Sequence, residues 1–124
     1  MKKQIVTKNA PGAVGPYSQA IVVGNTLYVS GQIPLNPATG ELVKEIGAAA
    51  QQVLENLQAI LTEAGYSMAD VIKTVVYLAD IDNFAKVNEI YAKYFREPYP
   101  ARSCVAVKDL PKGALLEIEC IAAK

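Results

Sequence analysis

The sequence predicts a single α+β domain spanning residues 1–124, in which helices pack on one face of a β-sheet. Three observations support this fold class. The chain has 124 residues, of which 52% are hydrophobic and 19% charged, as expected of one compact globular domain. β-rich runs alternate with stretches of helical periodicity. No linker-like shift in composition, repeat or low-complexity segment divides the chain.

Two β-rich runs near the N-terminus predict a hairpin. Residues 20–23 (AIVV) and 26–30 (TLYVS) flank Gly24 and Asn25, and a glycine at the first central position accepts the positive φ that a two-residue turn needs. The segment 31–40 (GQIPLNPATG) contains two prolines and has a glycine at each end. We therefore expect the chain to leave the sheet there as a surface loop.

The segment 46–64 is expected to form an amphipathic helix. Apolar residues recur there at spacings of three and four, and Gly65 follows as the expected stop signal. The residues of this stripe are Ile46, Ala50, Val53, Leu54, Leu57, Ile60, Leu61 and Ala64.

A central strand and a second helix are expected next. A short capping turn at 67–70 precedes 71–78 (VIKTVVYL), which is β-branched and mostly apolar on both faces. Asp82 is the expected N-cap of the second helix, which Pro98 and Pro100 end. The predicted buried stripe of this helix comprises Phe84, Val87, Tyr91, Tyr94 and Phe95.

Two further strands, 102–107 and 115–122, are separated by a turn at 110–113. The last strand places Leu116, Ile118, Cys120 and Ala122 on one face and Leu115, Glu117, Glu119 and Ile121 on the other. Since helices cover only one face of the sheet and the second face of this strand is not simply polar, we expect a closed homo-oligomer.

Composition excludes several classes of chemistry. Histidine is absent, which removes the commonest metal ligand, the usual general base and every Ser-His or Cys-His pair. Twelve Lys and Arg balance twelve Asp and Glu without a basic run, so nucleic acid is not an expected partner. The spacing of Cys104 and Cys120 matches no zinc or thioredoxin-like motif, and no disulfide is predicted.

The sequence also predicts a cytosolic protein that does not enter a membrane. No stretch approaches the roughly 18 uninterrupted apolar residues of a membrane span. Residues 1–9 carry positive charge, but no apolar block or small-residue cleavage pattern follows them, so a secretory signal is not expected.

Arg102 is the most unusual basic residue, because it stands at the start of a strand behind two prolines. A guanidinium presents a planar fork that matches a carboxylate with two parallel hydrogen bonds. Arg102 can therefore bind a ligand carboxylate, or it can pair with a neighbouring glutamate as an internal strut. Position alone does not separate these two roles.

Other candidates also have two interpretations. Glu117 and Glu119 share one strand face among apolar neighbours, where they can serve proton transfer or an inter-subunit salt bridge. Cys104 lies on the same face as Arg102, but without histidine to activate it the usual role is that of a small buried hydrophobe. Tyr17 can close over a site or fill a gap. Gly31, after Ser30, can admit a ligand close to the backbone or simply serve the turn.

The sequence resembles the family named for reactive intermediate deaminase A, also called the YjgF family. The similarity rests on 100–105 (PARSCV) followed by 116–119 (LEIE), and extends to 15–19 (GPYSQ), 30–34 (SGQIP) and 84–88 (FAKVN). It covers essentially the whole chain in the same order. The one departure is a short segment between Phe95 and Pro100, at the expected rim of the site.

The resemblance implies a chorismate-mutase-like fold with a mixed sheet, assembled as a homotrimer with ligand sites between subunits. It implies hydrolysis of 2-iminopropanoate and 2-iminobutanoate to 2-oxo acids and ammonia, without cofactor or metal. Arg102 is then expected to hold the substrate carboxylate and Glu117 to position or deprotonate water. The full set of site residues carried over comprises Tyr17, Ser30, Gly31, Asn88, Arg102, Cys104 and Glu117.

Two competing functions stay open at this point. A non-catalytic trimer that binds a carboxylate metabolite or regulates another protein fits the same residues. An endoribonuclease or translation inhibitor fits less well, because a neutral chain without histidine offers neither a phosphate-binding patch nor the usual acid-base pair. The sequence also leaves open the preferred imino acid and whether Glu119 assists or replaces Glu117.

Overall fold

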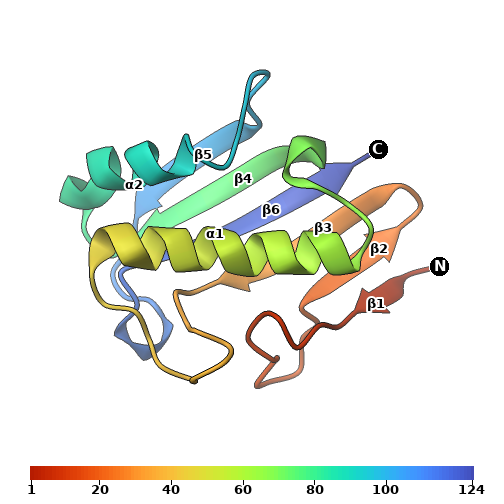
Figure 1. Cartoon of the computed structure of the whole chain (residues 1–124), viewed down its shortest axis with the longest axis horizontal. Helices are drawn as coiled ribbons and strands as arrows, with labels where there is room; N and C mark the ends of the chain where they lie inside the picture. The colour runs from red at the N-terminus through yellow and green to blue at the C-terminus, as the bar shows by residue number, and fades with distance from the viewer.

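A computed structural model describes all residues, 1–124, and has two helices on a six-stranded sheet (Figure 1). The strands are β1 (Lys3–Ile5), β2 (Ala20–Val23), β3 (Thr26–Gln32), β4 (Val71–Leu78), β5 (Ala101–Ala106) and β6 (Leu116–Ala123), and the helices are α1 (Ile46–Glu63) and α2 (Phe84–Tyr91). The strand order is β1-β2-β3-β6-β4-β5. The sheet is mixed, because β4 and β5 run parallel while the other neighbours are antiparallel.

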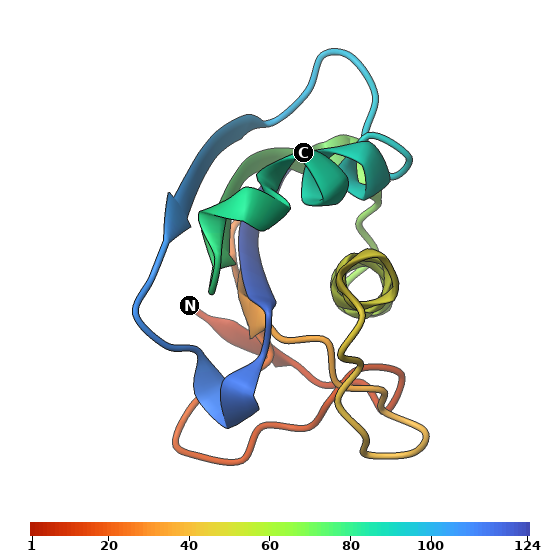
Figure 2. The same ribbon diagram turned by 90° about the vertical axis from the view of Figure 1, so that its left-hand side faces the viewer.

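Both helices lie on the same face of the sheet, and Figure 2 shows α1 end-on beside it. The α+β class, the hairpin and the long helix are confirmed, and α1 buries the predicted stripe against β3 and β6. None of the helices is both long enough and apolar enough to cross a membrane.

The central strand β6 has two different faces, as predicted. Leu116, Ile118 and Cys120 are buried under the helices. Glu117 and Glu119 lie on the opposite face, where no helix covers them and they are half-buried. In a single chain this face of the sheet is therefore uncovered, and it carries both carboxylates and apolar side chains.

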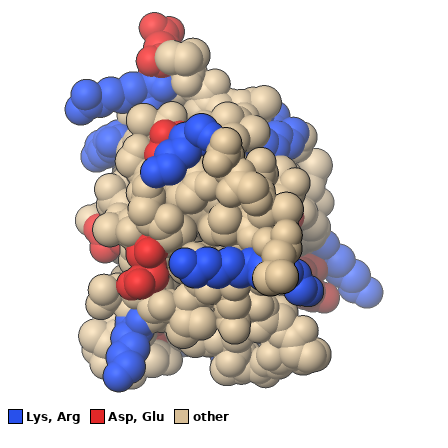
Figure 3. Space-filling view, turned by 90° about the vertical axis from the view of Figure 1, so that its right-hand side faces the viewer, with Lys and Arg blue, Asp and Glu red and all other residues tan.

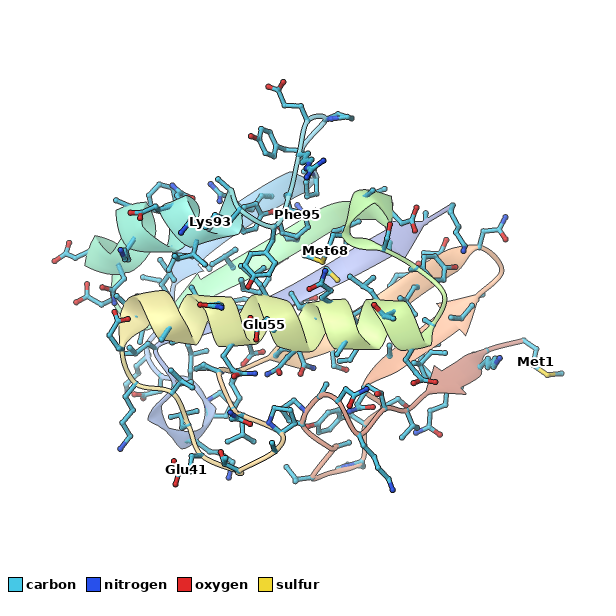
Figure 4. The ribbon with its side chains drawn as sticks, in the orientation of Figure 1. Met1, Glu41, Glu55, Met68, Lys93 and Phe95 are labelled. Carbon is cyan, nitrogen blue, oxygen red and sulfur yellow. The ribbon has the colours of Figure 1, made fainter.

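The second helix differs from its prediction at both ends. Asp80, not Asp82, accepts the capping hydrogen bond, from the backbone N–H of Asp82, and a 3-10 turn (Ile81–Asn83) precedes α2. Phe84 is 38% exposed instead of buried. The chain leaves α2 at Tyr91, yet Phe95 remains buried and lines a surface groove together with Met68 (Figure 4).

Two features of the N-terminal half were also missed. β1 is too short for its alternation to stand out, and it becomes a strand only by pairing with β2. β3 continues through Gln32, so Gly31 lies inside a strand and not at the start of the predicted loop. After β3, the buried Asn56 of α1 donates hydrogen bonds to the carbonyls of Ile33 and Leu35 and holds this segment in place.

Candidate functional site

Arg102 lies on the edge strand β5, on the face covered by α2. Its Nη1 donates a hydrogen bond to Oδ1 of Asn88 at 2.6 Å. Its Cζ lies 4.9 Å from the ring centroid of Tyr91 and 5.5 Å from that of Phe84. All three contacting residues belong to α2.

No carboxylate of the chain pairs with Arg102. The one ion pair in the structure joins Lys86 and Glu89, at 3.6 Å. The interpretation of Arg102 as an internal strut is therefore wrong for the isolated chain. The guanidinium is oriented, exposed and has N–H groups to spare, since it carries five donors.

A surface cavity of about 470 Å³ opens beside this guanidinium. Its lining comprises Asn88, Tyr91, Ala92, Tyr99, Pro100 and Arg102. The cavity therefore combines one cation and one amide with aromatic and apolar walls, which suits a small ligand that carries a carboxylate.

Cys104 follows on the same face of β5 and is half-buried against the core. Burial raises the pKa of its thiol, and the nearby Arg102 charge only partly opposes this shift. A raised pKa disfavours the thiolate, which is the nucleophilic form. The geometry therefore agrees with a packing role for the Cys104 side chain.

A second group of predicted residues gathers on the uncovered face of the sheet. Glu117 of β6 lies directly over Gly31 of β3, and a methyl group added at Gly31 would overlap the Glu117 carboxylate. The missing side chain at Gly31 thus makes room for this carboxylate. The register of β3 and β6 shifts at this point, between Val29 and Gln32.

Ser30 connects β3 to the loop that carries Tyr17. The Ser30 hydroxyl donates to the Ser18 carbonyl at 2.6 Å, and its backbone N–H donates to the Gln19 carbonyl at 2.9 Å. Tyr17 itself is 51% exposed, so its ring fills no gap within the chain. Tyr17, Ser30 and Glu119 line one surface cavity of about 450 Å³.

The two glutamates of β6 have different surroundings. Glu119 accepts a hydrogen bond from the Tyr77 hydroxyl at 2.5 Å, and this bond raises the pKa of Tyr77 to about 12. Glu117 has no hydrogen-bond or ion-pair partner in the chain, and burial, followed by the Glu119 charge, raises its pKa. Glu117 is therefore the carboxylate that is free to exchange a proton.

The two groups of site residues lie on opposite faces of the sheet. Arg102 pairs with Thr74 across β4 and β5, whereas Glu117 pairs with Tyr77 across β4 and β6. Successive side chains of a strand alternate between faces, so Thr74 and Tyr77, three residues apart, point to opposite sides. The chain therefore brings Arg102, Asn88 and Cys104 together, and separately Tyr17, Ser30, Gly31 and Glu117.

Four side chains at these sites were not predicted to serve them: Phe84 and Tyr91 beside Arg102, Thr74 beneath Tyr91, and Tyr77 beside Glu119. One signal was available for the first pair. Phe84, Asn88 and Tyr91 stand at i, i+4 and i+7, the spacing of a single helix stripe.

Comparison with known proteins adds family evidence to this geometry. The family model described as Endoribonuclease L-PSP matches residues 7–124. A RutC family protein of Pyrococcus horikoshii is 58% identical over 100% of this chain and 99% of its own. The 2-iminobutanoate/2-iminopropanoate deaminase of Escherichia coli is 47% identical over 100% and 99%.

Solved structures agree with the fold over the full length. A Rid family protein of unknown function from Yersinia pestis superposes with a TM-score of 0.97, at 52% identity, and covers 100% of both chains. The structure of Escherichia coli TdcF with bound serine gives a TM-score of 0.94 at 46% identity and covers 98% of each chain.

The contact between Gly31 and Glu117 gives a testable prediction. Gly31→Ala should fold, because Gly31 has no positive φ and its backbone accepts alanine, but the Glu117 side chain must leave its position. Gly12→Ala is the matched control, since nothing lies within 4 Å of a Cβ at Gly12. A crystal structure of Gly31→Ala with Glu117 in its original position would contradict this prediction.

Proposed function

Because the chain belongs to the Endoribonuclease L-PSP family, also called the YjgF or reactive intermediate deaminase A family, we propose that it hydrolyses 2-imino acids to 2-oxo acids and ammonia. The observation that carries the proposal is the Arg102 guanidinium, which Asn88 and two aromatic rings orient and no carboxylate of the chain neutralises. Such a group fits the carboxylate of a small substrate. The Escherichia coli relative named for this reaction supports the substrate class.

The relative TdcF was solved with serine bound, and serine carries the same carboxylate next to a nitrogen-bearing carbon. A 2-imino acid differs from a 2-amino acid in having a planar C=N bond at that carbon. Each charge-assisted hydrogen bond contributes about 1.5–3 kcal/mol, so two bonds from Arg102 can dominate recognition of so small a ligand.

Glu117 supplies the proton chemistry in this proposal. Its carboxylate takes a proton from water as the water oxygen bonds to the imine carbon, and the C=N π electrons move to nitrogen, which receives that proton from the Glu117 carboxyl group. The resulting carbinolamine collapses: Glu117 transfers the hydroxyl proton to the amine nitrogen, the C–N bond breaks, ammonia leaves and the C=O bond of the 2-oxo acid forms. Backbone groups near Gly31 and Cys104 orient the imine and the water. No step needs a cofactor or a metal.

The opposite placement of Arg102 and Glu117 requires a second copy of the chain in this proposal. The site then forms between subunits, with Arg102, Asn88 and Cys104 from one and Tyr17, Ser30, Gly31 and Glu117 from its neighbour. A homotrimer is the proposed assembly, in which the uncovered sheet face is buried between copies. The uncovered face carries the exposed side chains of Tyr17, Tyr28 and Val105, whose apolar surface can be buried in such contacts.

A carboxylate-binding trimer without catalysis is the competing function. Its site would need Arg102 but would have no use for an unpartnered glutamate with a raised pKa. The endoribonuclease name of the family has less support from the chain. On the face seen in Figure 3, acidic and basic side chains are interspersed among wide uncharged areas and form no continuous basic row.

Arg102 substitutions test the proposed function. Arg102→Ala should nearly abolish imine hydrolysis, and Arg102→Lys should fail as well because a point charge cannot reproduce the two-pronged fork. The assay follows keto-acid release in a coupled threonine dehydratase reaction. If the unmodified protein releases keto acid no faster than buffer does, the protein is a binder and not an enzyme. Near-normal rates for Arg102→Lys would contradict only the role given to Arg102.

The pH dependence of the reaction tests Glu117. A general base acts only when deprotonated, so hydrolysis should decline as the pH falls through the raised pKa of Glu117. Glu119→Gln removes the neighbouring negative charge and should shift this decline to lower pH, while burial still holds the pKa of Glu117 above its usual range. The measurement is kcat/KM against pH for the unmodified protein and for Glu119→Gln. Coincident profiles would refute the effect of the Glu119 charge on the pKa of Glu117.

A further inference from the structure

Three residues on one face of α2 contact a single side chain, that of Arg102 on β5. Phe84, Asn88 and Tyr91 stand at i, i+4 and i+7, and all three contact the Arg102 guanidinium. Asn88 accepts a hydrogen bond from Nη1, and the two aromatic rings lie within 4.9 and 5.5 Å of Cζ. The helix therefore contacts the guanidinium at the beginning, middle and end of its length.

Tyr91 is the fixed member of this stripe. Its ring is buried and lies 4.5 Å from that of Phe95, and its hydroxyl shares a 2.7 Å hydrogen bond with buried Thr74. Thr74 is also the cross-strand partner of Arg102. Tyr91 thus has a structural role in the core as well as its contact with the guanidinium.

Phe84 has no such second role within the chain. It is 38% exposed and is absent from the buried hydrophobic core. A large apolar side chain at the exposed start of a helix costs conformational freedom and gains little burial. Its contact with Arg102 is the one specific aromatic interaction that the structure gives it.

We propose that Phe84 is a positioning residue for Arg102, whose ring, together with Tyr91 and Asn88, holds the guanidinium so that its free N–H groups face a ligand carboxylate. An arginine that is ordered before binding loses less freedom when the ligand arrives. The proposal rests on the proposed function for the identity of the ligand, but the ordering of Arg102 is a property of the chain itself.

The effect should appear in binding rather than in the chemical step. A carboxylate contact that is equal in the ground state and the transition state changes KM and leaves kcat unaltered. Losing one exposed cation–π contact corresponds to about a 2- to 5-fold weaker affinity. Phe84→Tyr keeps an aromatic face, whereas Phe84→Leu keeps only apolar bulk.

The test compares Phe84→Leu, Phe84→Tyr and the control Ile81→Ala, an exposed apolar residue one turn earlier. Phe84→Leu should raise KM for 2-iminobutanoate and Kd for 2-oxobutanoate about 2- to 5-fold, with kcat within about 2-fold of the unmodified protein. Phe84→Tyr and Ile81→Ala should bind like the unmodified protein. The proposal would be overturned if Phe84→Leu bound as tightly as the unmodified protein. It would also be overturned if Phe84→Tyr or Ile81→Ala lost as much affinity as Phe84→Leu.

A measurement without ligand separates this proposal from the proposed function. The chain has two arginines, Arg96 and Arg102, so the Nε–H signals of an NMR spectrum contain an internal control. In Phe84→Leu the order parameter of Arg102 Nε–H should fall while that of Arg96 is unchanged, and Phe84→Tyr should restore it. An unchanged Arg102 order parameter in Phe84→Leu would refute the positioning role even if imine hydrolysis were established.

Discussion

The alternation of side chains across the sheet is the constraint on which the site depends. The register through β4 is fixed by hydrogen bonds to β5 on one side and β6 on the other, and it places Arg102 and Glu117 on opposite faces. No rotamer change can bring the two groups to one small ligand within a chain. Under the proposed function, the two faces act together only when a second copy supplies the missing half of the site.

The fold positions the charged group of each half of the site, Arg102 or Glu117, and places no opposite charge against it. On one face, α2 holds the Arg102 guanidinium through Asn88 and two rings, and no acid approaches it. On the other face, Gly31 makes room for Glu117, while Tyr77 engages Glu119 and leaves Glu117 as the unpartnered carboxylate. Arg102 has no ion-pair partner and Glu117 has neither an ion-pair nor a hydrogen-bond partner, and the two lie on opposite faces of the sheet. This arrangement supports the proposed site between subunits for a charged substrate.

The sequence predicted the structure best where a feature depends on residues close together in the chain. The stripe of α1, the hairpin turn and the two faces of β6 follow from spacing and turn chemistry, and the structure confirms them. The exposure of Phe84 and the strand position of Gly31 depend on tertiary contacts and were not predicted. The cap at Asp80 is a local hydrogen bond, but Asp80 and Asp82 are both residues that can cap a helix, and the sequence pattern alone does not choose between them. The separation of Arg102 from Glu117 depends on register across three strands, which no local pattern encodes.

Complementation between two inactive variants tests the shared site most directly. Arg102→Ala and Glu117→Gln should each be inactive alone, but their co-expression should assemble some sites with an intact Arg102 from one copy and an intact Glu117 from another. Random assortment in a trimer gives about a quarter of the unmodified specific activity. Mixed trimers, verified by mass spectrometry, that are no more active than the separate variants would contradict a site shared between subunits.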